Sequence, residues 1–73
     1  MIFIKRLANE GHTRQLTIER SMTEGWIARE HDDSAIRTSR LHDWRRVELA
    51  IALFEIQALR LQDEGWLEIS PQV

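Results

Sequence analysis

The sequence predicts an α+β fold, in which an antiparallel meander of about four strands packs against one long C-terminal helix. Short apolar or alternating segments, separated by turn-forming residues, fill the first two-thirds of the chain and are typical of hairpin-connected strands. The segment "DWRRVELAIALFEIQALRLQDEGW" (43–66) then repeats apolar residues at spacings of three and four, which indicates a helix. The chain of 73 residues allows one domain with a small core, so we treat 1–73 as a single unit.

The strands are predicted from local alternation and from the turn residues between them. In "RQLTIERS", Leu16 and Ile18 should face one side of a sheet, with Thr17 on the other. The turns are "NEGH" (9–12), "MTEG" (22–25) and "DDS" (32–34), which supply glycines for positive φ and aspartates that can bind nearby backbone amides. The predicted strands are therefore 2–7, 14–21, 26–31 and 35–41.

The helix is predicted over 44–64. Asp43 is a suitable N-cap, because its carboxylate can accept a backbone N–H of the first turn. No glycine or proline follows until Gly65, which is a natural C′ residue. The remaining residues, 66–73, are predicted as a tail, in which "WLEIS" (66–70) either forms a short terminal strand or packs against the domain.

The predicted helix has apolar residues on two sides. A helical wheel gives an inner stripe suited to packing on the sheet: Trp44, Val47, Ala50, Ile51, Phe54, Ala58 and Leu61. A second set lies on roughly the opposite side: Leu49, Ala52, Leu53, Ile56 and Leu59.

The second set leaves three alternatives, because a surface helix normally carries charge on its outer side. The N-terminal strand or the C-terminal "WLEI" could cover it, or it could stay partly exposed. The third alternative, which we favour, is that a second copy of the chain packs there, since two-fold dimers are common and would add to a small core. This hypothesis makes the chain a protein–protein interaction module and a homodimer, with Leu49, Leu53, Ile56 and Leu59 as interface residues.

Motifs for catalysis, metals and cofactors are not recognisable in the sequence. There is no cysteine, and the three glycines stand apart, so thiolate zinc sites and Gly-rich phosphate loops are excluded. His12, His31 and His42 lack ligand spacing, and nothing around Ser34 resembles a nucleophile elbow. We therefore expect no enzyme activity, no catalytic residue, no metal site, no cofactor and no small-molecule substrate.

The composition also indicates where the protein resides. The opening "MIFIKRLANEG" places its basic residues after the apolar run, unlike a signal peptide, and "LAIALF" (49–54) is much shorter than a membrane span. Because there is no cysteine, the composition suits a reducing compartment. We expect a cytoplasmic protein with no membrane partner.

Arginines in "IRTSRLHDWRR" (36–46) suggest an alternative function. Four arginines and one histidine accompany a single aspartate and Trp44, a combination found in nucleic-acid grooves. The first two-thirds of the chain, 1–46, carries a net charge of +2, whereas 47–73 carries −4. Alternatively, strand arginines could pair with glutamates on neighbouring strands. The candidate anion or nucleic-acid site is Arg37, Arg40, Arg45 and Arg46.

The layout of strands followed by a helix that ends in Gly65-Trp66 resembles the WGR domain over residues 14–67. The helix phase from Ala50 to Phe54 is also similar. The defining Trp-Gly-Arg triplet is absent, and the nearest stretch, "GWIAR" (25–29), has another order. The resemblance implies strands packed against a helix, but the family's link to nucleic acid does not transfer to particular residues. The arginine-rich composition equally fits a small proteobacterial domain.

Overall fold

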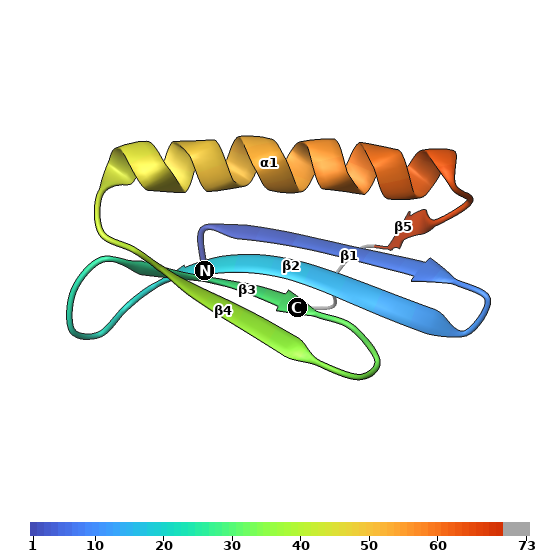
Figure 1. The fold of residues 1–73 in the computed structure, drawn as a ribbon, viewed down its shortest axis with the longest axis horizontal. Helices are drawn as coiled ribbons and strands as arrows, with labels where there is room; N and C mark the ends of the chain where they lie inside the picture. Colours follow the sequence, from blue (N-terminus) through green and yellow to red (C-terminus); the bar gives the residue numbers. More distant parts are fainter. Residues whose placement is uncertain (70–73) are drawn as a thin grey trace.

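A computed structural model describes residues 1–69 and has the predicted α+β architecture, with one helix lying along one face of an antiparallel sheet (Figure 1). The last residues of the predicted tail, 70–73, lie outside the described part of the chain. The elements in chain order are β1 (Phe3–Asn9), β2 (His12–Arg20), β3 (Trp26–His31), β4 (Ile36–Leu41), α1 (Trp44–Asp63) and β5 (Leu67–Ile69).

Within residues 1–69 the sheet contains five strands in the order β4-β3-β2-β1-β5: the predicted four-stranded meander, β1 to β4, is confirmed, and β5 adds a fifth strand beside β1. The chain leaves α1 and returns to the outer side of β1, where Arg6 pairs with Ile69 and Ala8 with Leu67. Of the two predicted alternatives for the tail, a terminal strand therefore forms over Leu67–Ile69. All strand pairs are antiparallel, and β4 and β5 are the two edges.

Strand ends differ from the prediction mainly at the first hairpin. The predicted four-residue turn is a two-residue turn, because Asn9 and His12 pair across the strands. Glu10 and Gly11 both have positive φ, at 50° and 82°, as a tight hairpin turn with right-handed strand twist requires. Glutamate rarely adopts a positive φ, so the residue type at position 10 did not predict this tight turn.

Both ends of α1 are capped as the sequence predicts. The Asp43 carboxylate accepts the backbone N–H of Arg46 at 2.9 Å. At the C-terminal end, Gly65 has φ +103°, and its N–H donates to the carbonyl of Gln62 at 3.1 Å. The N–H of Trp66 reaches the carbonyl of Leu61 at 2.9 Å, which completes a Schellman motif and turns the chain towards β5.

The core lies between α1 and the face of the sheet that it covers, and it has two parts. Towards the start of α1, Val47 and Phe54 pack on Leu16, Ile18 and Ala28. Towards its end, Ala58 and Leu61 pack on Leu7, with Trp66 against them. The predicted alternation of β2 is confirmed, because Leu16 and Ile18 are almost fully buried on the helix side.

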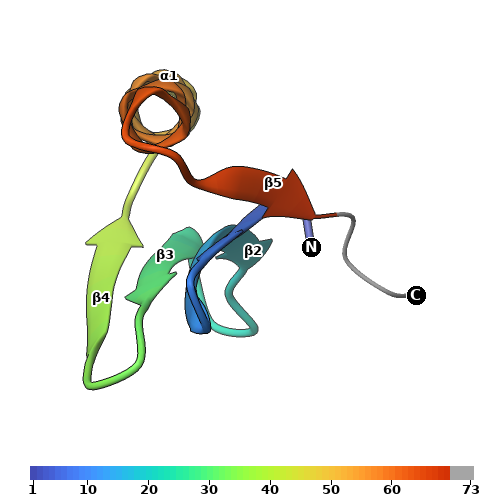
Figure 2. The same cartoon turned by 90° about the vertical axis from the view of Figure 1, so that its right-hand side faces the viewer.

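The second face of the sheet has no helix over it among residues 1–69 (Figure 2). Thr17 points to this face, yet only 3% of it is exposed. Its direct neighbours in the register are Ile4 on β1 and Arg29 on β3, and side chains from both sides of a central strand can cover a small residue. The prediction that Thr17 faces away from the core is therefore correct in direction, although the residue is not solvated.

Candidate functional site: the outer face of the helix

The side of α1 that points away from the sheet carries four large apolar side chains in solvent. Leu49 is 60% exposed, Leu53 54%, Ile56 51% and Leu59 62%. Ala52, between them, is also exposed. We call these five residues the outer face; Figures 1 and 2 show no other element above this side of the helix.

Two segments were alternatives for covering the outer face, and the structure places both elsewhere. The N-terminal strand is β1, which lies inside the sheet between β2 and β5. In the "WLEI" segment, Trp66 packs beneath α1 against Leu7, Ala58 and Leu61, and β5 joins the sheet edge. Neither segment reaches the outer face, so its apolar side chains remain in solvent within the described chain.

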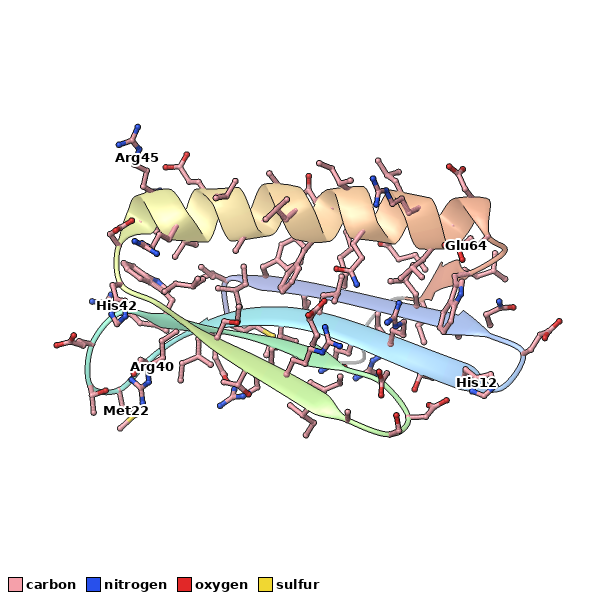
Figure 3. All side chains as sticks on the ribbon, in the orientation of Figure 1. His12, Met22, Arg40, His42, Arg45 and Glu64 are labelled. Carbon is pink, nitrogen blue, oxygen red and sulfur yellow. The ribbon has the colours of Figure 1, made fainter. Side chains whose placement is uncertain are left out.

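The ends of the outer face carry opposite charges. Arg45, in the first turn of α1, points away from the sheet (Figure 3). Asp63 lies in the last turn, 18 residues later and therefore on the same side of the helix. Neither side chain has an ion-pair partner within 4.0 Å among residues 1–69. Both charges oppose the dipole of their own helix, which favours anions at its N-terminus and cations at its C-terminus.

The four arginines predicted to bind an anion do not form one surface. Arg37 and Arg40 point to opposite faces of β4, as their pairing with Glu30 and Ile27 shows. Arg45 lies on the far side of α1 from Arg40 (Figure 3). Arg46 is near its own N-cap, with Nε 3.4 Å from the Asp43 carboxylate. The predicted cluster is close in sequence, but the reversal of direction at residues 42–43 disperses it.

Several arginines on the strands interact with neighbouring side chains. Arg29 forms an ion pair with Glu19, as the cross-strand alternative predicts for this pair. The Arg6 guanidinium donates two hydrogen bonds to the Gln15 side-chain oxygen. Arg14 lies over the Trp66 ring, with 5.9 Å between its guanidinium carbon and the ring centroid. Of these contacts, only the ion pair between Arg29 and Glu19 neutralises positive charge on the sheet; the other two orient a guanidinium that keeps its charge.

One polar cluster joins the tips of two hairpins, and sequence reasoning did not identify it. The His12 ring nitrogen Nδ1 shares a hydrogen bond with the Asp33 carboxylate, which also accepts the backbone N–H of Thr13. These hydrogen bonds lower the pKa of Asp33. His12 and Asp33 are 21 residues apart, and only the strand register brings them together, so no local motif could reveal the contact.

Asp32 sits beside this cluster and organises the turn between β3 and β4. Its carboxylate accepts the backbone N–H groups of Ser34 and Ala35, both at 2.8 Å, and these bonds lower its pKa. The predicted role of the "DDS" aspartates in binding nearby amides is thus confirmed for Asp32. Among residues 1–69 no group of three or more histidine and acidic side chains has the geometry to hold a metal ion.

A small depression lies beside the helix, where Gln57 faces the strands. Arg14, Glu30 and Arg37 contribute to its walls, and its volume is about 100 Å³. Ordinary small-molecule pockets occupy roughly 300–1,000 Å³. This depression is smaller than such pockets. Two hollows at the hairpin tip around His31 and Asp32 are larger, at about 390 and 430 Å³, and are lined mostly by polar residues.

No family model, no curated protein and no solved structure matches the chain. The resemblance to WGR domains accordingly stays a prediction. No helix within residues 1–69 combines the length and the apolar content that a membrane crossing would need.

Proposed function

We propose that the protein is a small, non-enzymatic interaction module that associates with a second copy of itself through the outer face of α1. The observation that carries the proposal is the exposure of Leu49, Leu53, Ile56 and Leu59, each more than half in solvent on one side of one helix. Isolated apolar residues on a surface are ordinary, but a row of four on one helix is typical of an interface.

The size of the domain also supports association. Eight hydrophobic residues within the described part of the chain make up the buried core, and a chain of this length buries only about 60% of its unfolded surface. Packing two outer faces together would remove further apolar surface from water, at about 25 cal/mol for each Å². The stripe from Leu49 to Leu59 spans only about 15 Å along the helix, so we expect micromolar rather than nanomolar affinity.

The nucleic-acid alternative has less support from the geometry. Arg37, Arg40 and Arg45 have no ion-pair partner within 4.0 Å among residues 1–69, which leaves their charges available. They point in different directions, however, and a nucleic-acid backbone needs cations along one continuous surface.

Sedimentation equilibrium over roughly 5–500 µM tests self-association, since this range brackets the expected micromolar affinity. The wild type should change from monomer to dimer, and Leu53→Lys should stay monomeric because a charge would be buried at the centre of the interface. Ile36→Lys is a matched control, since Ile36 on β4 is 62% exposed and lies away from α1; it should dimerise like the wild type.

Two results would count against the proposal. A wild type that stays monomeric at the highest concentration would eliminate self-association. Equal loss of dimer in the two lysine variants would move the interface away from the outer face. Circular dichroism should show that both variants are folded, because both substitutions replace solvent-exposed side chains.

A further inference from the structure

Resting on the proposed function, the geometry points to a specific arrangement: we propose that two copies pair their α1 helices antiparallel about a two-fold axis near residue 54, with Arg45 of each copy opposite Asp63 of the other. The occupant of the outer face is therefore a second copy in a defined direction.

The apolar residues place the axis. Leu49 and Leu59 lie five positions on either side of residue 54, and Ala52 and Ile56 lie two positions on either side. In a two-fold antiparallel pair, residues equally far from the axis on opposite sides face one another, because such an interface is self-complementary. An axis near residue 54 consequently brings leucine opposite leucine and alanine opposite isoleucine.

The same axis also brings two opposite charges, Arg45 and Asp63, together. Arg45 and Asp63 each lie nine positions from residue 54, and their spacing of five helical turns puts both on the side of the outer face. An antiparallel pair therefore contains two Arg45–Asp63 contacts, one at each end. A parallel pair would instead put arginine beside arginine at one end and aspartate beside aspartate at the other.

The unfavourable placement of these charges within one chain supports the same arrangement. The first turn of α1 has no acidic residue, and Arg45 there opposes the helix dipole; Asp63 does so in the last turn. In the antiparallel pair each charge also lies near the helix terminus of the second copy that carries the opposite partial charge. An arrangement that destabilises the isolated helix is thus favourable in the pair.

Arg60 is the one cation at the acidic end, and it is compatible with this register. It lies six positions from residue 54, opposite the region of Leu49 and Glu48 in the second copy. An arginine can lay its aliphatic stem along an apolar neighbour and keep the guanidinium in water. The sheet leaves room for the second helix, because it lies wholly on the opposite side of α1 (Figure 2).

Charge reversal tests the direction of pairing. Arg45→Asp and Asp63→Arg should each weaken the dimer by about tenfold in Kd, because each converts two attractive contacts into two repulsive ones. The double variant, with both substitutions in one chain, should return to near the wild-type Kd. Arg40→Asp is the matched control, since Arg40 is an exposed arginine on β4 without an ion-pair partner among residues 1–69, and it should leave Kd unchanged.

A stability measurement separates pairing from folding. In dilute, monomeric protein both single reversals should keep or raise the melting temperature, because each now agrees with the helix dipole. A merely structural role for either residue would lower it. Weaker association together with equal or higher monomer stability is the expected combination.

Cross-linking gives a second, independent measurement, since the chain has no cysteine of its own. An equal mixture of Arg45→Cys and Asp63→Cys should form an interchain disulfide on mild oxidation. Arg45→Cys alone should not, because its two copies would lie about 27 Å apart in the antiparallel pair.

The outcomes distinguish this inference from the function on which it rests. If the wild type dimerises, Leu53→Lys is monomeric, and the reversals have no effect or Arg45→Cys links to itself, then the outer face is the interface but the antiparallel register is wrong. If the wild type never dimerises, the proposed function itself fails.

Discussion

The inner and outer sides of α1 have similar apolar content but differ in burial. On the inner side, Val47 is fully buried and Phe54 is only 9% exposed. On the outer side, Leu53, adjacent to Phe54 in the chain, is 54% exposed. Hydrophobicity alone therefore does not show which residues of α1 stabilise the fold. The residues that face the sheet do so, and those that face away stay exposed and available to a partner.

The largest expected effect comes from the inner side. Phe54→Ala should lower the free energy of unfolding by about 3–5 kcal/mol, which includes the cost of the cavity. Phe54 packs against the core strands and against the Phe3 ring, with 5.9 Å between the ring centroids. Urea denaturation at low micromolar concentration measures the change.

Leu53→Ala is the control for Phe54→Ala, because it truncates the neighbouring apolar side chain on the other side of the helix. In monomeric protein it should change the free energy of unfolding by less than about 0.5 kcal/mol, as is usual for exposed positions. Similar losses in the two variants would mean that the outer side also stabilises the monomer, and the contrast between the two sides would fail.

An increase in side-chain volume should destabilise the monomer on the inner side of α1 but not on the outer side. Ala58→Leu should cost about 1–3 kcal/mol of stability, because Ala58 on α1 is only 3% exposed and packs against Leu7 of β1. Ala52→Leu makes the same change at an exposed position and should leave monomer stability nearly constant. It should also tighten the proposed dimer, since it adds apolar surface to the outer face. Thermal unfolding and sedimentation equilibrium measure the two effects.

The smallest expected effect is on the pH dependence of the melting temperature in acid. It comes from the hairpin tips and should not depend on the residues of α1. The pKa values of Asp32 and Asp33 are lowered by hydrogen bonds in the folded state. Stability from these groups is therefore present above the unfolded pKa, near 4, and is lost as the pH falls through the lower folded values. Melting temperatures between pH 5 and pH 2 should fall less steeply for Asp33→Asn than for the wild type.

An equally steep fall for Asp33→Asn would show that other carboxylates dominate the acid response. The outer face offers a further check, because Leu53→Ala changes no titrating group. Its melting temperature should follow the wild-type pH dependence in dilute protein.

The fold could be predicted from sequence where the signals were local. The alternation around Leu16 and Ile18, the Asp43 cap and the Gly65 stop each act through nearby backbone atoms, and each is confirmed. The outer face could be predicted for the same reason, since it follows from helical spacing; of the three alternatives for it, coverage by the N-terminal strand or by "WLEI" is wrong within the described chain.

The features that depend on distant pairing were harder to predict. β5 has only three residues, too few to show alternation, and it forms because the Schellman motif directs the chain to the edge of β1. The tight first hairpin depends on positive φ at Glu10, against the preference of that residue. The arginine cluster was adjacent in sequence, but the change of direction between β4 and α1 distributed Arg37, Arg40 and Arg45 to different surfaces.

The attachment of α1 at both of its ends affects the backbone entropy that would be lost on binding. One end follows directly from β4 and the other leads through Gly65 into β5, so the helix is connected to both edges of one sheet. A helix held at two edges has little freedom to pivot or unwind before a partner arrives. Binding to it would therefore lose little backbone entropy, and even a short apolar row could give measurable affinity because it is ordered in advance.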